Sequence, residues 1–260
     1  LHAFWGIGAT MGPIIMSAYF ALNYSWRSGY LTLGIIQAVI FLIILISLPL
    51  WKRQQKESLA DITKHNQDLT YKDIVKTKGV LLSMLIFVVY CAAEFGIGQW
   101  GASYLVSVRT FVPAVAGTLI GTYYAGITIG RIVSGFISFK YTNKQLIFFG
   151  ISIFIVASIL LLINLPLYIL YSLFFLQGIG LAPIFPSLTH ETPVRFGSDK
   201  SQHIIGLQMA SAYTGASLFP ALFGVIARNT TLKIYPFFIL LLAITLLLIN
   251  ELLVRKTKER

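Results

Sequence analysis

Long apolar segments alternate with short polar ones along most of the chain. Eight of these segments are rich in Leu, Ile, Val, Phe, Ala and Gly, and a helix needs about 20 apolar residues to cross a bilayer. Because lipid offers no hydrogen-bond partners, each segment must satisfy its backbone internally, which predicts helices rather than barrel strands. The predicted spans are approximately 2–22, 30–50, 79–107, 113–139, 145–163, 167–189, 203–227 and 234–254.

Composition supports this assignment and excludes soluble classes of protein. The chain is 57% hydrophobic and only 11% charged, with a mean hydropathy of +0.79, so a polar shell around a globular core cannot be assembled from it. We therefore expect an all-α integral membrane protein, and neither a soluble enzyme nor a nucleic-acid-binding domain. A single cysteine, Cys91, and four scattered histidines exclude a disulfide framework and predict no metal site.

The net charge of +11 indicates orientation in the membrane. One set of alternating loops, together with the C-terminal segment, holds fifteen of the twenty basic residues, the opposite set holds four, and Arg131 falls inside a span. Basic residues favour the cytoplasmic side. We therefore expect the long polar stretch 51–78 and both ends of the chain to be cytoplasmic.

Weak internal repeats link several of the predicted spans. Tyr124, Gly126 and Gly135 match Tyr213, Gly215 and Gly224 at an offset of 89 residues. Gly96-Ile97-Gly98 matches Gly178-Ile179-Gly180 at an offset of 82, and Gly8, Ala9 and Pro13 match Gly215, Ala216 and Pro220 at an offset of 207. These matches predict a transporter in which the last six helices form three plus three.

Three motifs resemble those of the major facilitator superfamily. Gly8-x3-Gly12-Pro13 is similar to the glycine-proline motif of its fifth helix, and Gly130-Arg131-x3-Gly135 with Lys140 and Lys144 is similar to its helix-loop-helix signature. Residues 94–105 resemble the seventh helix of the fucose-permease-like sugar/proton symporters. The resemblance implies helices five to twelve of a twelve-helix fold, and since Leu1 is not a methionine we expect a fragment whose upstream helices are absent.

The same resemblance implies a division into three regions. Residues 1–50 would be the last two helices of the N-terminal half, residues 51–78 a cytoplasmic linker, and residues 79–260 the C-terminal half of six helices. Two departures from the family pattern stand out. Met16 and Ser17 replace the paired glycines that usually continue the antiporter motif, and Ser138 and Phe139 stand where the signature usually has an acidic residue.

Glu94 is the only acidic residue in the middle of a predicted span. An ionisable side chain at bilayer depth is costly, so it generally faces a cavity and marks a transport pathway. Tyr90, Cys91, Gly98 and Gly101 are on the same helix side. We predict that Glu94 couples proton movement to transport or binds the solute, with a structural role between two helices as the alternative.

Amides and aromatic rings on four predicted spans are the groups that bind a polyhydroxylated solute, because they hydrogen-bond hydroxyls and stack on a sugar ring. Packing or interfacial positions are the alternative for each of them. The predicted solute-binding residues are Gln99, Trp100, Tyr104, Tyr123, Tyr124, Gln177, Gln208 and Tyr213.

Arg131 is expected on the cytoplasmic side of its span, where pairing with helix-end carbonyls or with a carboxylate across the two halves would hold an outward-open state. Solute binding and snorkelling to lipid headgroups are its alternatives. Glycine and proline permit bending. The predicted bending positions are Gly12, Pro13, Pro183, Pro186 and Pro220.

These features predict a secondary transporter, not an enzyme, that moves a small polar solute by alternating access. A sugar or related metabolite is the expected solute, the proton is the expected coupling ion, and no cofactor is expected. The expected partners are the solute and membrane lipid, without nucleic acid, for a monomer in the cell membrane. A proton-driven exporter of drugs or metabolites is the alternative, and a membrane-embedded receptor or enzyme is a less favoured one.

Overall fold

The structure is a computed structural model that describes residues 2–64 and 71–258. The described residues form ten α-helices and one short 3₁₀ helix and contain no strand. The elements are α1 (His2–Ala21), α2 (Trp26–Lys64), α3 (Tyr71–Lys76), α4 (Val80–Ser107), α5 (Pro113–Ile137), α6 (Asn143–Leu160), α7 (Leu167–Leu181), α8 (Ile184–Phe196), α9 (Ser198–Asn229), η1 (Leu232–Ile234) and α10 (Tyr235–Lys258).

Six helical segments of the described chain are long and apolar enough to cross a membrane. They are Trp26–Leu50, Val80–Ser107, Asn143–Leu160, Leu167–Phe196, Ser198–Asn229 and Leu232–Thr257. The predicted count of eight spans is not confirmed, because α1 and α5 are not among the six. α5 is diluted by Gly, Thr and Arg131, and it packs against α1. Contact between two protein surfaces requires a less apolar sequence than contact with lipid.

Several helix boundaries differ from the sequence prediction. The second span continues beyond Leu50 as the helix α2 to Lys64, and part of the predicted linker forms the short helix α3. The predicted span 167–189 is divided into α7 and α8 at Ala182 and Pro183. Proline cannot donate the backbone hydrogen bond that a continuous helix requires, which accounts for the division at this point.

Local sequence signals define several helix ends. Thr142 caps α6 in a capping box with Gln145, and Pro113 occupies the first turn of α5, where its missing N–H costs nothing. Gly197 has a φ of +90° at the turn between α8 and α9. A residue with a side chain is strained at that φ, so glycine permits this tight connection.

The helices from α4 to α10 form a bundle with internal symmetry. α4 packs against α9 and α10, whereas α7 packs against α5 and α6. Suppose that α4 corresponds to α7 together with α8, α5 to α9, and α6 to α10. The contact of α4 with α9 is then equivalent to that of α7 with α5, and the contact of α4 with α10 to that of α7 with α6. The contact between α6 and α10 maps onto itself. The arrangement agrees with the predicted three-plus-three repeat.

The glycines of the repeats explain why the symmetric pairs come close. A Cβ at Gly126 of α5 would collide with the Phe175 carbonyl of α7, and a Cβ at Gly215 of α9 would collide with the Val88 carbonyl of α4. The offset of 89 residues therefore joins equivalent positions. The offset of 82 does not, because Gly96 faces side chains of α10 whereas Gly178 faces the backbone of α5.

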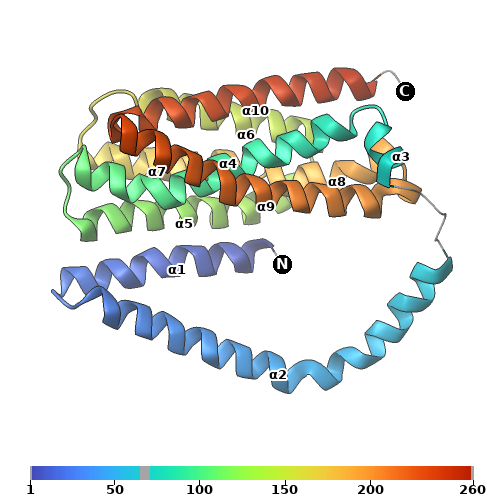
Figure 1. The fold of residues 1–260 in the computed structure, drawn as a ribbon, viewed down its shortest axis with the longest axis horizontal. Coiled ribbons are helices and arrows are strands. Elements are labelled where there is room, and N and C mark those ends of the chain that lie inside the picture. The colour runs from blue at the N-terminus through green and yellow to red at the C-terminus, as the bar shows by residue number, and fades with distance from the viewer. Residues whose placement is uncertain (1, 65–70, 259–260) are drawn as a thin grey trace.

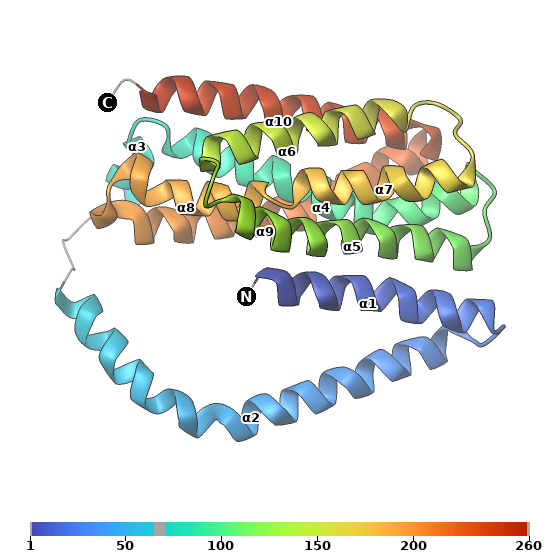
Figure 2. The ribbon, with the colours of Figure 1, turned by 180° about the vertical axis from the view of Figure 1, so that it is seen from behind.

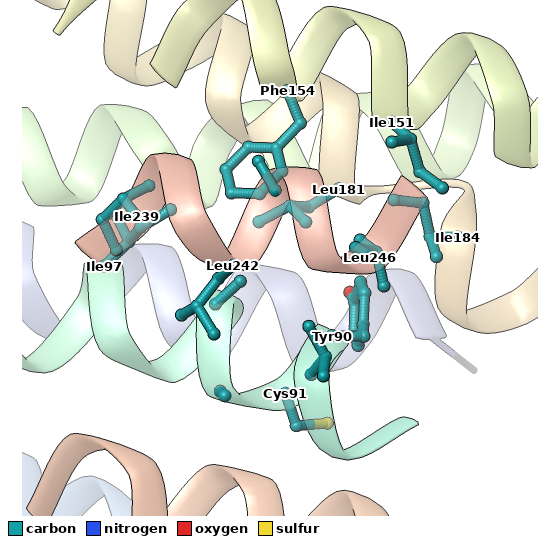
Figure 3. Packing of buried hydrophobic residues seen from close by; sticks show 14 of the residues in the cluster. Tyr90, Cys91, Ile97, Ile151, Phe154, Leu181, Ile184, Ile239, Leu242 and Leu246 are labelled. Carbon is teal, nitrogen blue, oxygen red and sulfur yellow. The ribbon is translucent and has the colours of Figure 1, made fainter. Parts of the chain in front are cut away.

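The core of the bundle is an apolar cluster to which each helix from α3 to α10 contributes. Figure 3 shows Leu242 and Leu246 of α10 beside Tyr90 and Ile97 of α4, with Phe154 of α6 near Leu181 of α7. All of these side chains are 5% exposed or less. Residues 89–93 of α4 all belong to this cluster, so the polar groups described below lie directly against it.

The helices α1 and α2 lie along one flank of the bundle. Figures 1 and 2 show α1 beside α5, and α2 beyond α1, diverging from it and then bending near its middle back toward the end of the bundle where α3 lies. Contacts between α1 and α5 are extensive, whereas α2 contacts mainly α1. None of the apolar window of Trp26–Leu50 is buried. This surface requires lipid or further helices to cover it.

Candidate functional site

Glu94 and Arg131 form a buried ion pair between α4 and α5. Arg131 Nη2 lies 3.1 Å from Glu94 Oε1, and the two side chains are 7% and 4% exposed. Neither α5, which carries Arg131, nor the adjacent α1 contains an acidic residue. The negative charge beside Arg131 therefore comes from Glu94 on α4. The contact is a buried, charge-assisted hydrogen bond from Arg131 to Glu94 near the centre of α4.

Aromatic side chains surround this ion pair. Tyr90, one turn before Glu94, accepts a hydrogen bond from Arg131 Nη2 at 3.4 Å. The guanidinium of Arg131 also lies over the ring of Trp5, with its Cζ 4.6 Å from the ring centroid, which is within the range of a cation–π interaction. Tyr123 of α5 donates its hydroxyl to the Glu94 backbone carbonyl at 3.1 Å. The charges are therefore held by three helices.

A cavity of about 330 Å³ opens beside the ion pair. This volume is near the lower end of the range for small-molecule pockets, about 300–1,000 Å³. Apart from the Glu94–Arg131 pair, most of its wall is aromatic or aliphatic. Its lining residues come from α1, α4, α5, α8 and α9 and are Trp5, Cys91, Glu94, Phe95, Arg131, Phe185, Met209, Ala212, Tyr213 and Ala216.

Two further hollows continue from this cavity along the interface of α1 with α4 and α5. The second, of about 620 Å³, shares Trp5 and Phe95 with the first. The third, of about 520 Å³, shares Pro13 and Gly98 with the second and extends to Ser107. A row of hollows thus joins the ion pair to the end of the bundle where α4 ends and α5 begins.

Three of the predicted solute-binding residues line these hollows. Tyr213 lines the first cavity and is 77% exposed, whereas Gln99 and Tyr124 line the second. Tyr124 also contacts Trp5 edge to face, with ring centroids 6.1 Å apart. Its phenol lies against Gly98, which has no side chain to exclude it.

The other predicted solute-binding residues lie away from the cavity wall. Trp100 donates its indole N–H to the Pro220 carbonyl at 2.8 Å, and Tyr104 stacks on Tyr235 with ring centroids 4.9 Å apart. Tyr123 is fully buried behind Glu94. These three side chains fasten helices to one another.

The two buried amides are also outside the cavity. Gln208 donates to Ser83 Oγ at 2.6 Å and exchanges hydrogen bonds with Thr192. Gln177 is fully buried, and neither of its amide atoms has a hydrogen-bond partner in the described part of the chain. An amide network for a polyhydroxylated ring is therefore not assembled at the Glu94–Arg131 pair.

The predicted bending positions behave in different ways. α1 continues through Gly12 and Pro13, and α9 continues through Pro220. Pro183 is at the division between α7 and α8, and Pro186 is in the first turn of α8, where proline is tolerated. Pro183 is thus the proline of this set at which a helix stops.

A second buried ion pair lies within α8. Arg195 Nε is 3.2 Å from Glu191 Oε2, and Glu191 also accepts a hydrogen bond of 3.3 Å from Asn143 of α6. The sequence prediction placed Glu191 and Arg195 beyond the end of their span, but α8 extends to Phe196. The sequence signal that could have predicted this pair is the spacing of four residues between an acidic and a basic residue on one helix.

The structure also adds cavity residues that sequence analysis missed. Trp5, Phe95, Phe185 and Met209 line the cavity, but each is a common apolar residue inside an apolar span. The expected partners of Arg131 were helix-end carbonyls or a carboxylate across the two halves. In the structure its carboxylate partner is Glu94 on the neighbouring helix α4.

Comparison with known proteins identifies the group to which the chain is similar. Residues 1–220 and 110–260 match the family model of the Major Facilitator Superfamily. Residues 110–220 fall in both matches, as expected for a chain built from repeats. The chain is also 24% identical over 195 residues to Bypass of stop codon protein 6 from Saccharomyces cerevisiae, a match that covers 69% of this chain and 38% of that protein. The aligned chain thus spans less than half of the relative's length.

Proposed function

The chain belongs to the major facilitator superfamily of membrane transporters, and from this premise we propose that it transports a small polar solute with a proton. The observation that carries the proposal is the buried pair of Glu94 and Arg131 beside a cavity. In a transporter, an ionisable pair at this depth is positioned to change its charge state as the cavity opens to either side.

Glu94 is the proton-carrying group in this proposal. A carboxylate paired with Arg131 is favoured in the ionised form by the opposite charge, whereas burial favours the neutral form. Separating the two side chains, or bringing a competing group to Arg131, therefore changes the proton affinity of Glu94. Binding of solute and binding of a proton are coupled through the same contact.

The interface of α1 with α5 supports alternating access as the mechanism. Thr10 of α1 and Thr128 of α5 share a hydrogen bond of 3.2 Å, and Gly6 lies directly against Thr128. Because α1 contacts the bundle mainly through α5, a rocking motion at this interface would open the row of hollows without unfolding either part.

The proposed solute is a sugar or related metabolite, and the proposed direction of transport is uptake. The resemblance to sugar/proton symporters favours uptake of a sugar or related metabolite, and the motif around Pro13 favours export as the second candidate. The loop charges favour cytoplasmic ends and a cytoplasmic 51–78 segment, in the cell membrane.

Replacement of Glu94 tests the coupling role. We expect Glu94→Gln in the complete gene product to abolish accumulation driven by a pH gradient while retaining exchange of solute, because glutamine forms hydrogen bonds but does not titrate. Uptake of labelled L-fucose, D-glucose and mandelate into proteoliposomes measures transport. Infrared difference spectra on acidification measure protonation of the carboxyl without requiring the natural solute.

The matched control is Glu251→Gln, because Glu251 lies on α10 and does not line the cavity. This variant should keep both the infrared carboxyl signal and the accumulation of any probe that the wild type concentrates. If Glu94→Gln retains the wild-type infrared signal, then Glu94 is not the group that takes up the proton.

A further inference from the structure

The Glu94–Arg131 pair is electrically neutral, and both of its side chains are almost completely buried. Protonation of Glu94 removes the negative charge and leaves the positive one. Arg131 cannot compensate by losing its own proton, because the guanidinium stays charged in proteins. A buried charge without a counter-charge is strongly unfavourable, so protonation of Glu94 favours the binding of a replacement anion at Arg131.

The described residues that line the cavity do not provide that anion. Among them Glu94 is the acidic residue and Arg131 the basic one, and the others carry apolar, aromatic, phenol or thiol groups. A neutral sugar would hydrogen-bond to Arg131 but would leave the positive charge uncompensated. A solute that carries a carboxylate restores neutrality by taking the place of Glu94.

We infer that the transported solute is a small amphipathic carboxylate that binds to Arg131 when Glu94 is protonated. The inference rests on the proposed function. One proton and one anion enter together, Glu94 becomes neutral, and the solute carboxylate accepts the N–H groups of Arg131. The site has no net charge when empty and none when loaded, so the charge buried during the conformational change is the same in both directions.

The shape and chemistry of the cavity specify the remainder of the solute. A volume of about 330 Å³ and the rings of Trp5, Phe95, Phe185 and Tyr213 suit a compact body with an apolar or aromatic face. The amides Gln177 and Gln208, which would favour several hydroxyl groups, do not line the cavity. One carboxylate on an apolar or ring-shaped body fits both parts of the site.

Among the groups around Glu94, its own carboxyl is the acid with the lowest ordinary pKa. Near neutral pH, phenols and thiols are uncharged and the guanidinium is charged. Trp5 of α1 and Phe185 of α8 do not titrate. The titratable or charged neighbours are Tyr90 and Cys91 on α4, Tyr123, Tyr124 and Arg131 on α5, Tyr213 on α9 and, behind Tyr123, Tyr235 on α10.

Binding to the purified complete protein tests the inference with matched probes. Benzoate, mandelate and cyclohexanecarboxylate are compared by calorimetry with their uncharged amides and with L-fucose. We expect carboxylates to bind about tenfold or more tightly than their amides, because a charge-assisted contact replaces a neutral one. The affinity for carboxylates should rise from neutral to mildly acidic pH.

Substitutions of Glu94 and of Arg131 should change the affinity for carboxylates in opposite directions. Glu94→Gln removes the internal competitor of the solute, so carboxylate affinity should rise about tenfold and lose its pH dependence. Arg131→Gln should equalise carboxylate and amide affinities. Arg228→Gln, which removes an exposed positive charge at the end of α9, is the matched control and should leave both affinities unchanged.

Uptake by the wild type provides a second test that does not depend on a variant folding. Mandelate uptake into proteoliposomes with an acidic exterior should be unaffected by a potassium diffusion potential, because proton and anion move together without net charge. Uptake of a neutral solute with a proton would instead respond to the potential.

The inference is wrong if no carboxylate of the panel binds more tightly than its amide, if Glu94→Gln does not raise carboxylate affinity, or if mandelate uptake follows the membrane potential. The proposed function survives any of these outcomes as long as the infrared signal of Glu94 protonation is present. Loss of that signal from the wild type would overturn both.

Discussion

Two buried pairs of glutamate and arginine occur in the described chain, and they differ in how they are built. Glu94 and Arg131 belong to different helices, α4 and α5, and meet at 3.1 Å beside a cavity. Glu191 and Arg195 belong to the same helix, α8, at 3.2 Å and a spacing of four residues. The first pair is next to Trp5, and the second is next to Asn143 of α6.

The difference separates a contact that movement can open from one that movement preserves. A shift of α4 relative to α5 changes the distance between Glu94 and Arg131, and it changes the balance of charge in the cavity. No rigid movement of α8 changes the spacing of Glu191 and Arg195, because one helix carries both. Burial and charge alone therefore do not identify a transport residue. The feature that distinguishes the two pairs is whether their members belong to two helices or to one.

The largest effect on stability is expected at the pair that joins two helices. Glu94→Gln should lower the free energy of unfolding by about 3 kcal/mol, since Arg131 remains charged and buried after its partner is removed. Thermal denaturation in detergent with and without benzoate measures the change. Benzoate should restore part of the lost stability, and a variant as stable as the wild type would contradict the importance of the pair.

A smaller effect is expected at the pair within α8. Arg195→Gln should cost about 2 kcal/mol, equivalent to one charged hydrogen bond, because Glu191 keeps the amide of Asn143 as a donor. Denaturation measures the loss, and transport driven by a pH gradient should persist. If Arg195→Gln abolishes gradient-driven accumulation in correctly folded protein, the distinction between the two pairs fails.

The smallest effect is expected for the aromatic neighbour of the central pair. Trp5→Leu removes the ring beneath Arg131 and should cost about 1 kcal/mol, because the ion pair itself remains. Carboxylate affinity of Glu94→Gln with and without Trp5→Leu measures the contribution of the ring to the anion site. Trp26→Leu is the control, because Trp26 packs on Tyr30 outside the central cavity. Equal losses from both substitutions would exclude a specific role for Trp5.

Prediction from sequence was strongest where a property belongs to one segment. The apolar lengths predicted membrane helices, and the isolation of Glu94 in its span predicted a side chain that faces a cavity, as Glu94 does in the structure. The offset of 89 residues predicted that Gly126 and Gly215 are equivalent, and both permit close helix contact. Each of these inferences depends on composition or on spacing along the chain, which the sequence carries directly.

Prediction was weaker where two segments had to meet. Gln208 and Trp100 have the chemistry of solute-binding groups, yet one bonds to Ser83 and the other to the Pro220 carbonyl. Arg131 was expected to pair with helix-end carbonyls or with a carboxylate across the two halves, and it pairs instead with Glu94 of the adjacent helix. Amides, indoles and guanidiniums serve solutes and helix packing equally well, so residue type does not distinguish these roles.

The sequence by itself determined that this chain crosses a membrane as helices and that Glu94 is a costly residue requiring a compensating partner. Only the tertiary structure decided which partner compensates it, which rings enclose it and which amides are excluded. The physical reason is that helical periodicity defines the side of a helix on which a residue lies, whereas the helix facing that side is chosen by packing among all the elements.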